Sequence, residues 1–332
     1  MSSEILSAHN KETILKEFAW TELLSIDNSQ YAIPYIAKNK NIISKIDALL
    51  PQLPTQHKFY NENSTDFRKL NDRSVHLIVT SPPYWTLKRY IDSYNQLGHI
   101  NDYEEFLGEL DKVWEMCYSA LVPGGRLVCV VGDVLLSRRK NNGRHMVMPL
   151  HSSIQEHCRK IGYDNLSPII WHKISNASFE VPGNTTFLGK PYEPNAIIKN
   201  DIEYLIMLRK HGGYRSPGWL ERKFSVISEE NQKRWFSQIW HGITGASTRN
   251  HPAPYPIELI TRIIRMFSFV GDTVLDPFLG SGTTSIAAFL SGRNSIGIEL
   301  EKEYFDLAVR RFIKETKSLI SNHKYIINDE VA

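Results

Sequence analysis

A strand that runs through a glycine turn into a helix is encoded by Val274-Leu275-Asp276-Pro277-Phe278-Leu279-Gly280-Ser281-Gly282-Thr283-Thr284. Gly280 and Gly282 have no Cβ, so a ligand can approach the backbone closely at the turn. The start of the helix that follows offers unpaired N–H groups and a positive dipole end to a carboxylate or a phosphate. The stretch therefore predicts a strand–turn–helix unit of an α/β protein with an anion-binding end.

The next predicted strand ends on an acid, in Ile296-Gly297-Ile298-Glu299. A carboxylate at a strand end can accept both hydroxyls of a ribose, so the two features together indicate a cofactor that contains a nucleoside. The plainer alternative is a tight turn followed by a solvated acid. A P-loop is excluded because no lysine follows Gly282, and NAD is disfavoured because Ser285 stands where its motif needs a third glycine.

A second motif, Thr80-Ser81-Pro82-Pro83-Tyr84-Trp85, directly follows residues 75–79 of a β-branched run. Two prolines fix φ and remove two N–H donors, so this turn is stiff. Ser81 and the proline carbonyls supply acceptors and Tyr84 supplies a flat ring. This set can grip an exocyclic NH₂ group while stacking on its base. The alternative is a rigid proline turn with a core aromatic residue.

Strands and helices alternate around these motifs. Apolar runs predict strands at 75–80, 127–131, 169–172, 202–208, 273–275 and 295–300, and helical spacing predicts helices at 103–121, 148–162, 256–268, 281–291 and 302–314. This alternation predicts a mostly parallel sheet with helices on both faces. Residues 1–50 have an amphipathic, helical pattern. Residues 174–250 are irregular and mildly basic, and we expect Trp219, Trp235 and Trp240 there to be packing residues.

Composition sets wider limits. The chain has 332 residues, and 39 Lys and Arg against 36 Asp and Glu give a net charge of +3. This excludes a histone-like polycation but leaves room for a nucleic-acid partner on one face. Three cysteines without a CxxC pair indicate a reducing compartment, and Cys117, Cys129 and Cys158 are expected in the core. No apolar run of about 18 residues and no signal-peptide pattern occur, so we expect a cytoplasmic protein.

The two motifs together resemble the DNA amino-methyltransferases that use S-adenosylmethionine. Their order, with the SPPY motif first and the glycine turn last, is similar to the β group of that family, and the serine in SPPY resembles its N4-cytosine branch. Leu121-Val122-Pro123-Gly124-Gly125 with Val131-Gly132-Asp133 is similar to the central segment of the family. His251-Pro-Ala-Pro-Tyr-Pro-Ile-Glu-Leu resembles the helix that closes over the methionine end of the cofactor. The resemblance covers about residues 57–315 and implies a Rossmann-like methyltransferase fold.

The resemblance implies methyl transfer to the N4 amine of a flipped cytosine in double-stranded DNA. Ser81 and the Pro82 carbonyl would accept the two amine hydrogens, Pro83 would stiffen the turn, and Tyr84 would stack on the base. Glu299 would hold the ribose of the cofactor. The remaining cofactor contacts implied are Asp276, Pro277, Phe278, Gly280, Gly282, Thr283, Thr284 and His251. One departure stands out, because a Gly-Asp pair of the family is replaced by Tyr60-Asn61-Glu62-Asn63. Either Glu62 or Asp66 is left to contact the adenine.

We expect four segments: an N-terminal helical extension (1–56), which the resemblance does not cover, a catalytic part (57–173), a target-recognition region (174–250) and a cofactor-binding part (251–332). We expect phosphate contacts from Lys88, Arg89, Arg138, Arg139, Lys140 and Arg144, with a solvated basic loop as the alternative. A companion restriction endonuclease is a possible partner. His172, His211, His241 and His251 have no metal-ligand spacing, so no metal is expected. The alternatives are N6-adenine methylation by the same fold, a non-catalytic DNA-binding module and, more weakly, an RNA substrate.

Overall fold

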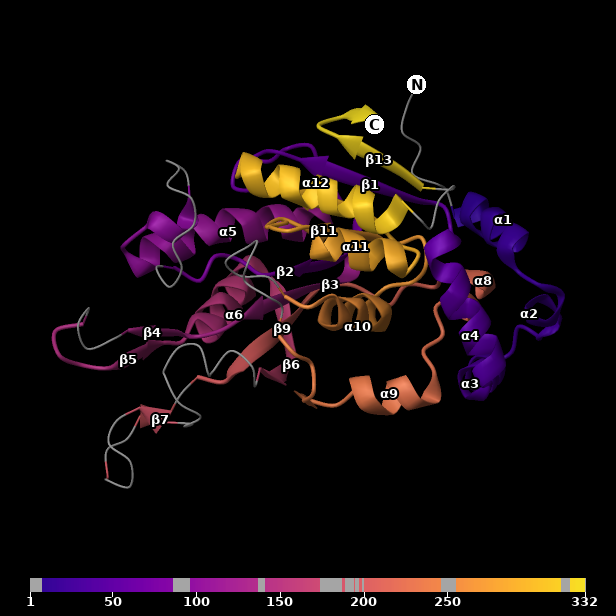
Figure 1. Ribbon diagram of the computed structural model, residues 1–332, viewed down its shortest axis with the longest axis horizontal. Coiled ribbons are helices and arrows are strands. Elements are labelled where there is room, and N and C mark those ends of the chain that lie inside the picture. Colours follow the sequence, from indigo (N-terminus) through magenta and orange to yellow (C-terminus); the bar gives the residue numbers. More distant parts are fainter. Residues whose placement is uncertain are drawn as a thin grey trace.

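The computed structural model describes residues 8–85, 96–136, 141–173, 187–188, 194, 197–198, 200–245, 255–317 and 323–331. Within these residues one sheet runs through the molecule in the order β10-β6-β9-β3-β2-β11-β12-β1-β13-β14 (Figure 1). Its strands are β1 (Thr55–Tyr60), β2 (Val75–Thr80), β3 (Leu121–Val131), β6 (Tyr163–His172), β9 (Ile202–Lys210), β10 (Ile239–Trp240), β11 (Thr273–Asp276), β12 (Asn294–Ile298), β13 (His323–Ile327) and β14 (Glu330–Val331).

The predicted mostly parallel sheet is confirmed. All neighbours from β3 across to β13 pair in parallel, as does β10 with β6. The strand β9 is antiparallel to both β3 and β6, and β14 is antiparallel to β13. Two small hairpins lie outside the sheet: β4 (Val134–Leu136) with β5 (Met146–Met148), and β7 (Phe187–Leu188) with β8 (Ile197–Ile198).

Helices cover both faces, because successive side chains of each central strand point to opposite sides. Leu127 and Cys129 of β3 belong to the core under α5 (Tyr103–Ala120) and α6 (Leu150–Ile161). Val128 and Val130 belong to the core under α10 (Ile257–Phe267) and α11 (Thr283–Leu290). The helix α12 (Lys302–Thr316) packs with α11 over β1. This two-sided burial explains the continuous apolar runs of the central strands.

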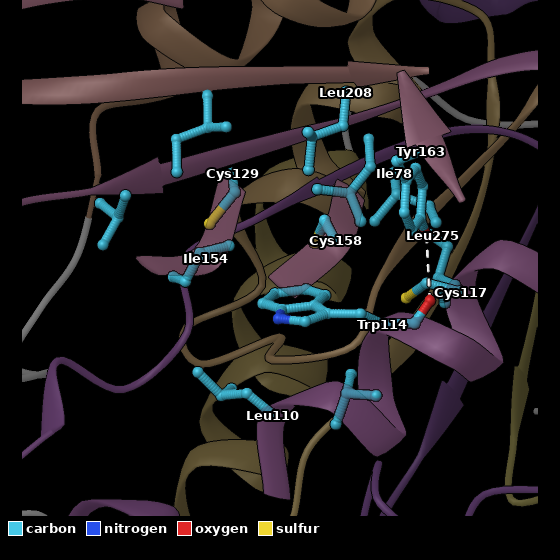
Figure 2. Packing of buried hydrophobic residues seen from close by; sticks show 14 of the residues in the cluster. Ile78, Leu110, Trp114, Cys117, Cys129, Ile154, Cys158, Tyr163, Leu208 and Leu275 are labelled. Carbon is cyan, nitrogen blue, oxygen red and sulfur yellow. Dashed lines mark hydrogen bonds between the residues drawn. The ribbon is translucent and has the colours of Figure 1, made fainter. Parts of the chain in front are cut away.

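Trp114 of α5 lies at the centre of the first core, with the three cysteines among its neighbours (Figure 2). Tyr163 Oη donates to the Trp114 carbonyl at 3.0 Å, which satisfies the buried phenol. Cys117, Cys129 and Cys158 are unpaired and fully buried, and burial raises the pKa of all three thiols. They are packing residues, as predicted, and a buried neutral thiol is a poor nucleophile.

The described part of the N-terminal extension, which starts at Ala8, is helical as predicted. It consists of α1 (Ala8–Phe18), α2 (Thr21–Ser25), α3 (Ala32–Lys38), α4 (Lys40–Leu49) and the short 3₁₀ helix η1 (Leu50–Gln52). These helices share one apolar cluster with α8 (Trp219–Phe224), at the end of the molecule away from the β4–β5 hairpin (Figure 1). None of the helices among the described residues combines the length and apolar character needed to cross a membrane.

The described part of segment 174–250 is integrated into the rest of the fold, and the strand predicted at 202–208 is confirmed there as β9. The strand β9 lies inside the main sheet, and α8 packs against the N-terminal helices. Trp235, the last residue of α9 (Glu229–Trp235), and Trp240 of β10 are buried in the second core. This confirms their expected packing role. The sequence around these elements has weak periodicity because short helices and loops alternate there, and this obscured their place in the fold.

Two predicted boundaries also shift. The strand predicted at 127–131 begins earlier, because β3 starts at Leu121, directly after α5 ends at Ala120, and includes Pro123-Gly124-Gly125. The helix predicted from residue 281 begins instead at Thr283, because Gly280 and Gly282 have φ of +53° and +80°. Left-handed backbone of this kind cannot continue an α-helix.

Candidate active site

The carboxyl ends of four adjacent strands, β2, β11, β12 and β1, meet at one cavity. It encloses about 830 Å³, part of it open to solvent. Each strand contributes the residues that follow it, as expected for ligand sites in open α/β sheets. The lining residues are Asn63, Ser64, Ser81, Pro83, Gln96, Leu97, Tyr255, Phe278, Leu279, Gly280, Ser281, Thr283, Ile298, Glu299, Leu300, Glu301 and Tyr304.

The turn after β11 and the start of α11 form one wall of this cavity. Gly282 is the residue before α11, and a Cβ placed on it would lie 3.0 Å from the Cβ of Ala308 in α12. Glycine therefore permits both the left-handed backbone and the close packing of α12. Arg311 of α12 donates to the Thr283 hydroxyl at 2.9 Å and to Ser281 Oγ at 3.2 Å. The turn is thus held from behind, with the Ser281 and Thr283 side chains in the cavity wall.

Asp276, the last residue of β11, joins the two sequence motifs. Its carboxylate accepts hydrogen bonds from the hydroxyls of Thr80 at 2.7 Å, Tyr255 at 2.7 Å and Thr284 at 2.6 Å. The Phe278 N–H adds a fourth at 3.1 Å. The side chain has no exposed surface and is not part of the cavity wall. Asp276 therefore fixes the ends of β2 and β11 to each other, in place of the expected direct contact with a ligand.

Glu299 follows β12, and its carboxylate faces the cavity. One oxygen accepts the Gly280 N–H at 2.7 Å and the other accepts the Glu301 N–H at 3.0 Å. Burial raises the pKa of this carboxyl to about 7, against the opposing effect of the two backbone hydrogen bonds. A carboxylate has about four lone-pair positions, so two remain for a ligand with two neighbouring hydroxyls.

The SPPY turn begins where Thr80 is bound to Asp276. Ser81 and Pro83 line the cavity, whereas Pro82 and Tyr84 are buried behind them. The Ser81 hydroxyl donates to Tyr84 Oη at 3.3 Å, and Tyr84 Oη donates to the Val130 carbonyl at 3.4 Å. Because Ser81 gives its hydrogen to Tyr84, its lone pairs are left to accept from a group in the cavity.

Comparison with known proteins identifies the family of this chain. Residues 75–310 match the DNA methylase family, which covers most of the chain. The chain belongs to this family. Type II methyltransferase M.MthZI of Methanothermobacter thermautotrophicus is 36% identical over 304 residues, which are 84% of this chain and 82% of that protein. Type II methyltransferase M.MjaI of Methanocaldococcus jannaschii is 38% identical over 280 residues, 75% of this chain and 89% of that protein.

A solved structure supports the same family assignment for this chain. TTHA0409 of Thermus thermophilus, a proposed DNA modification methylase crystallised with S-adenosyl-L-methionine, has 48% sequence identity and a TM-score of 0.67. The match covers 82% of this chain and 98% of that one. The Rossmann-like methyltransferase fold predicted from the motifs is therefore confirmed.

The predicted site residues fall into four groups in the structure. Ser81, Pro83, Phe278, Gly280, Thr283 and Glu299 line the cavity. Pro82, Tyr84, Asp276, Pro277, Gly282 and Thr284 are not in its wall, although they adjoin residues that are. His251, Lys88, Arg89, Arg138, Arg139 and Lys140 lie outside the described residues. Arg144 is exposed in the turn between β4 and β5.

Neither acid that replaces the Gly-Asp pair of the family lines the described cavity. Glu62 forms an ion pair with Lys69 at 2.7 Å, and Asp66 is exposed. The loop after β1 instead presents Asn63 and Ser64 to the cavity, and Ser64 donates to the Pro277 carbonyl. The choice between Glu62 and Asp66 therefore omitted the residues that the backbone turns inward.

Sequence reasoning also missed Tyr255, the tyrosine of the HPAPYP segment. Its hydroxyl donates to Asp276, and the residue lines the cavity beside Ser81. Burial raises its pKa well above the usual range, so the phenol stays protonated and remains a donor. A tyrosine set between two prolines just upstream of the cofactor strand was a usable signal. Gln96, Leu97 and Tyr304, which carry no motif, had none.

Proposed function

We propose that this methylase transfers a methyl group from S-adenosyl-L-methionine to the N4 amine of cytosine in double-stranded DNA. The observation that carries the proposal is the Ser81 hydroxyl, which opens into the cavity and donates its hydrogen to Tyr84, so that its lone pairs can accept from a ligand. The serine of the SPPY turn favours cytosine over adenine, because the adenine branch of the family usually has an aspartate in its place. N6-adenine methylation remains the second candidate.

The donor set of the cavity fits S-adenosylmethionine. Glu299 has two lone-pair positions for the two ribose hydroxyls, and Phe278 and Leu300 offer apolar surface to the adenine. The start of α11, with the Ser281 and Thr283 hydroxyls, suits the methionine carboxylate. When bound, the cofactor supplies an electrophilic methyl group on a sulfonium.

The residues of the SPPY turn then prepare a weak nucleophile. The exocyclic amine of cytosine is conjugated with its ring, so its lone pair must be turned toward the methyl group. Ser81 Oγ and the Pro82 carbonyl accept the two amine hydrogens. The Tyr84 hydroxyl holds the Ser81 hydrogen from the buried side of the turn, in place of the expected stacking of its ring on the base. The rate enhancement comes from positioning and from acceptors aligned with the charge that develops on the amine.

Basic residues beside this edge are proposed to grip the duplex. The β4–β5 hairpin begins directly after β3 and carries the exposed Arg144 in its turn. We include Lys88, Arg89, Arg138, Arg139 and Lys140 in the same phosphate contacts. The four-segment division, with target recognition within 174–250, is kept as a proposal for the part of that segment outside β9, α8, α9 and β10. A separately acting companion endonuclease would complete a restriction–modification pair.

Methylation of host DNA tests the function. Nucleosides from cells that express the wild-type protein should contain N4-methylcytosine, and long-read sequencing should place it at one recognition site. The Ser81→Ala enzyme should lose about 100-fold in kcat, as when one charge-stabilising hydrogen-bonding group is removed, with an unchanged Kd for the cofactor. Ser74→Ala is the matched control, because Ser74 lies at the other end of β2 and donates to the Asn71 carbonyl at 2.6 Å.

Other modified bases would redirect the proposal. N6-methyladenine in place of N4-methylcytosine would overturn the base assignment and leave the methylase activity standing. A protein that binds cofactor and DNA but modifies no base would favour the non-catalytic alternative. Full activity in the Ser81→Ala enzyme would remove Ser81 from the reaction.

A further inference from the structure

Asn61, the first residue after β1, holds the backbone of the loop that carries Glu299. Its side-chain amide donates to the Glu299 carbonyl at 2.8 Å and to the Leu300 carbonyl at 2.9 Å. An asparagine amide has two N–H donors, so both are used on this loop. Because β1 and β12 are parallel neighbours with Tyr60 opposite Ile298, Asn61 lies beside the loop as β12 ends. Glu299 and Leu300 both line the cavity.

Asn61 is itself held by the turn between β13 and β14. Its N–H donates to Asn328 Oδ1 at 2.9 Å, and the Asn328 N–H donates to the Phe59 carbonyl at 2.9 Å. Asn328 and Asp329 have φ of +46° and +71°, the left-handed pair that a tight hairpin turn requires. The turn therefore reaches back over the end of β1.

Further contacts fix the same turn in place. Asp329 accepts a hydrogen bond from Tyr60 Oη at 2.9 Å, and Lys69 bridges Asp329 at 2.9 Å and Glu62 at 2.7 Å. Glu62 thus serves this cluster and not the cavity. Asn61 and the hairpin both lie outside residues 75–310, the part that matches the family.

We propose that the β13–β14 turn, acting through Asn61, positions the ribose-binding loop of the cofactor site. Because Asn61 holds both loop carbonyls, the Glu299 side chain stays where the Gly280 and Glu301 N–H groups bind its oxygens. The loop is therefore already ordered before the cofactor binds, which lowers the entropic cost of binding. Asn61 is a positioning residue, because it contacts the loop and does not line the described cavity. The inference rests on the proposed cofactor of this site.

Asn294 provides a matched control for a purely structural role. It lies at the opposite end of β12, where Oδ1 accepts the Gln56 N–H at 2.8 Å and Nδ2 donates to the Gly271 carbonyl at 2.9 Å. Its side chain therefore makes as many contacts between neighbouring elements as Asn61 does. Neither Asn294 nor its two partners line the cavity.

The experiment compares full-length Asn61→Ala and Asn294→Ala with wild type. Calorimetric titration with S-adenosylmethionine should give an increase in Kd of about tenfold for Asn61→Ala, in line with the loss of two modest hydrogen bonds. For Asn294→Ala the Kd should stay within about twofold of wild type, although both variants should lower Tm by similar amounts. At saturating cofactor, kcat of Asn61→Ala should stay within about twofold of wild type, so that the effect appears in KM.

Asn328→Gly separates the contact from the turn. Glycine keeps the left-handed backbone but removes the oxygen that holds Asn61, so the Kd should rise about threefold with the hairpin intact. An unchanged Kd in Asn61→Ala, or equal losses of affinity in Asn61→Ala and Asn294→Ala, would overturn the proposal. A wild-type protein that binds no S-adenosylmethionine would overturn the proposed cofactor first, and is recognised before any variant is made.

Discussion

Asp276 and Glu299 end neighbouring parallel strands, with Asp276 opposite Gly297 in the register, yet their carboxylates have different partners. All four hydrogen bonds to Asp276 come from the protein, three from hydroxyls and one from a backbone N–H. Glu299 accepts two from the residues that the structure describes, and it faces the cavity. With about four lone-pair positions on each group, Asp276 has none to spare and Glu299 has two.

The comparison separates positioning from ligand binding at one sheet edge. Burial raises the pKa of both carboxyls, and for Asp276 the hydrogen bonds from Thr284, Tyr255 and Thr80 oppose that rise. A strand-end acid is therefore not a ligand contact by its position alone. The number of protein donors that already reach it decides whether it can accept from a ligand.

The largest effect is expected from Asp276→Ala. The change leaves buried donors on Thr80, Tyr255, Thr284 and Phe278 without their acceptor, at about 1–3 kcal/mol for each group that finds no other partner. We expect the free energy of unfolding to fall by about 4 kcal/mol, measured by urea titration, with loss of methyl transfer. A loss below about 1 kcal/mol would contradict the assignment of Asp276 as the joint between the two motifs.

Glu299→Gln is expected to act on the cofactor instead of the fold, with a rise in Kd of about 10-fold at pH 8, where the wild-type carboxylate is ionised. Because its pKa is raised to about 7, wild-type affinity should increase from pH 6 to pH 8 by about fivefold more than that of the Gln variant. Titration calorimetry at several pH values measures the affinity of both proteins. Ionisation of the cofactor itself affects both proteins equally, so it cancels in the ratio of their affinities.

The raised pKa of Glu299 affects the stability of the fold in the opposite direction to its effect on cofactor affinity. The folded protein holds the Glu299 proton more tightly than the unfolded chain, whose pKa is near 4.5, so stability falls as pH rises from about 4.5 to 7. This part of the pH dependence should be absent from the Gln variant. Parallel affinity profiles in wild type and Glu299→Gln would contradict a ligand-facing role for Glu299.

The elements of the site were predictable because their signals are local. The β-branched run at 75–80 is a strand with those bounds, and each motif follows a strand of the parallel sheet. Gly280, Gly282 and Glu299 indicated a cofactor that contains a nucleoside, whereas S-adenosylmethionine came from the resemblance of the two motifs to a known family. Such features depend on neighbours within a few residues, so one sequence is enough to read them.

The partners of these residues were not predictable, because they come from distant parts of the chain. Asp276 meets Thr80 across 196 positions, and Asn61 meets Glu299 across 238. An aspartate that ends a strand gives no sign of how many hydroxyls will converge on it. For the same reason, the strand predicted at 202–208 gave no sign that, as β9, it pairs antiparallel with both β3 and β6.

The smallest effect is expected from Tyr255→Phe, which removes one of the hydroxyls that donate to Asp276. Asp276 keeps Thr80 and Thr284 as partners, while the ring of residue 255 still lines the cavity. We expect a stability loss of about 1 kcal/mol and an increase in cofactor Kd of about threefold, because the SPPY turn and the glycine turn stay joined.

Tyr163→Phe is the control for this last change. Tyr163 is buried in the core under α5 and α6, and its hydroxyl makes one hydrogen bond, to the Trp114 carbonyl (Figure 2). Removal of that hydroxyl should cost a similar stability, measured by urea unfolding, with no change in Kd. A Kd that rises more than about 30-fold in Tyr255→Phe would mean that the phenol binds the ligand directly, beyond the worth of one positioning hydrogen bond. Tyr255 would then belong with Glu299 rather than with Asp276.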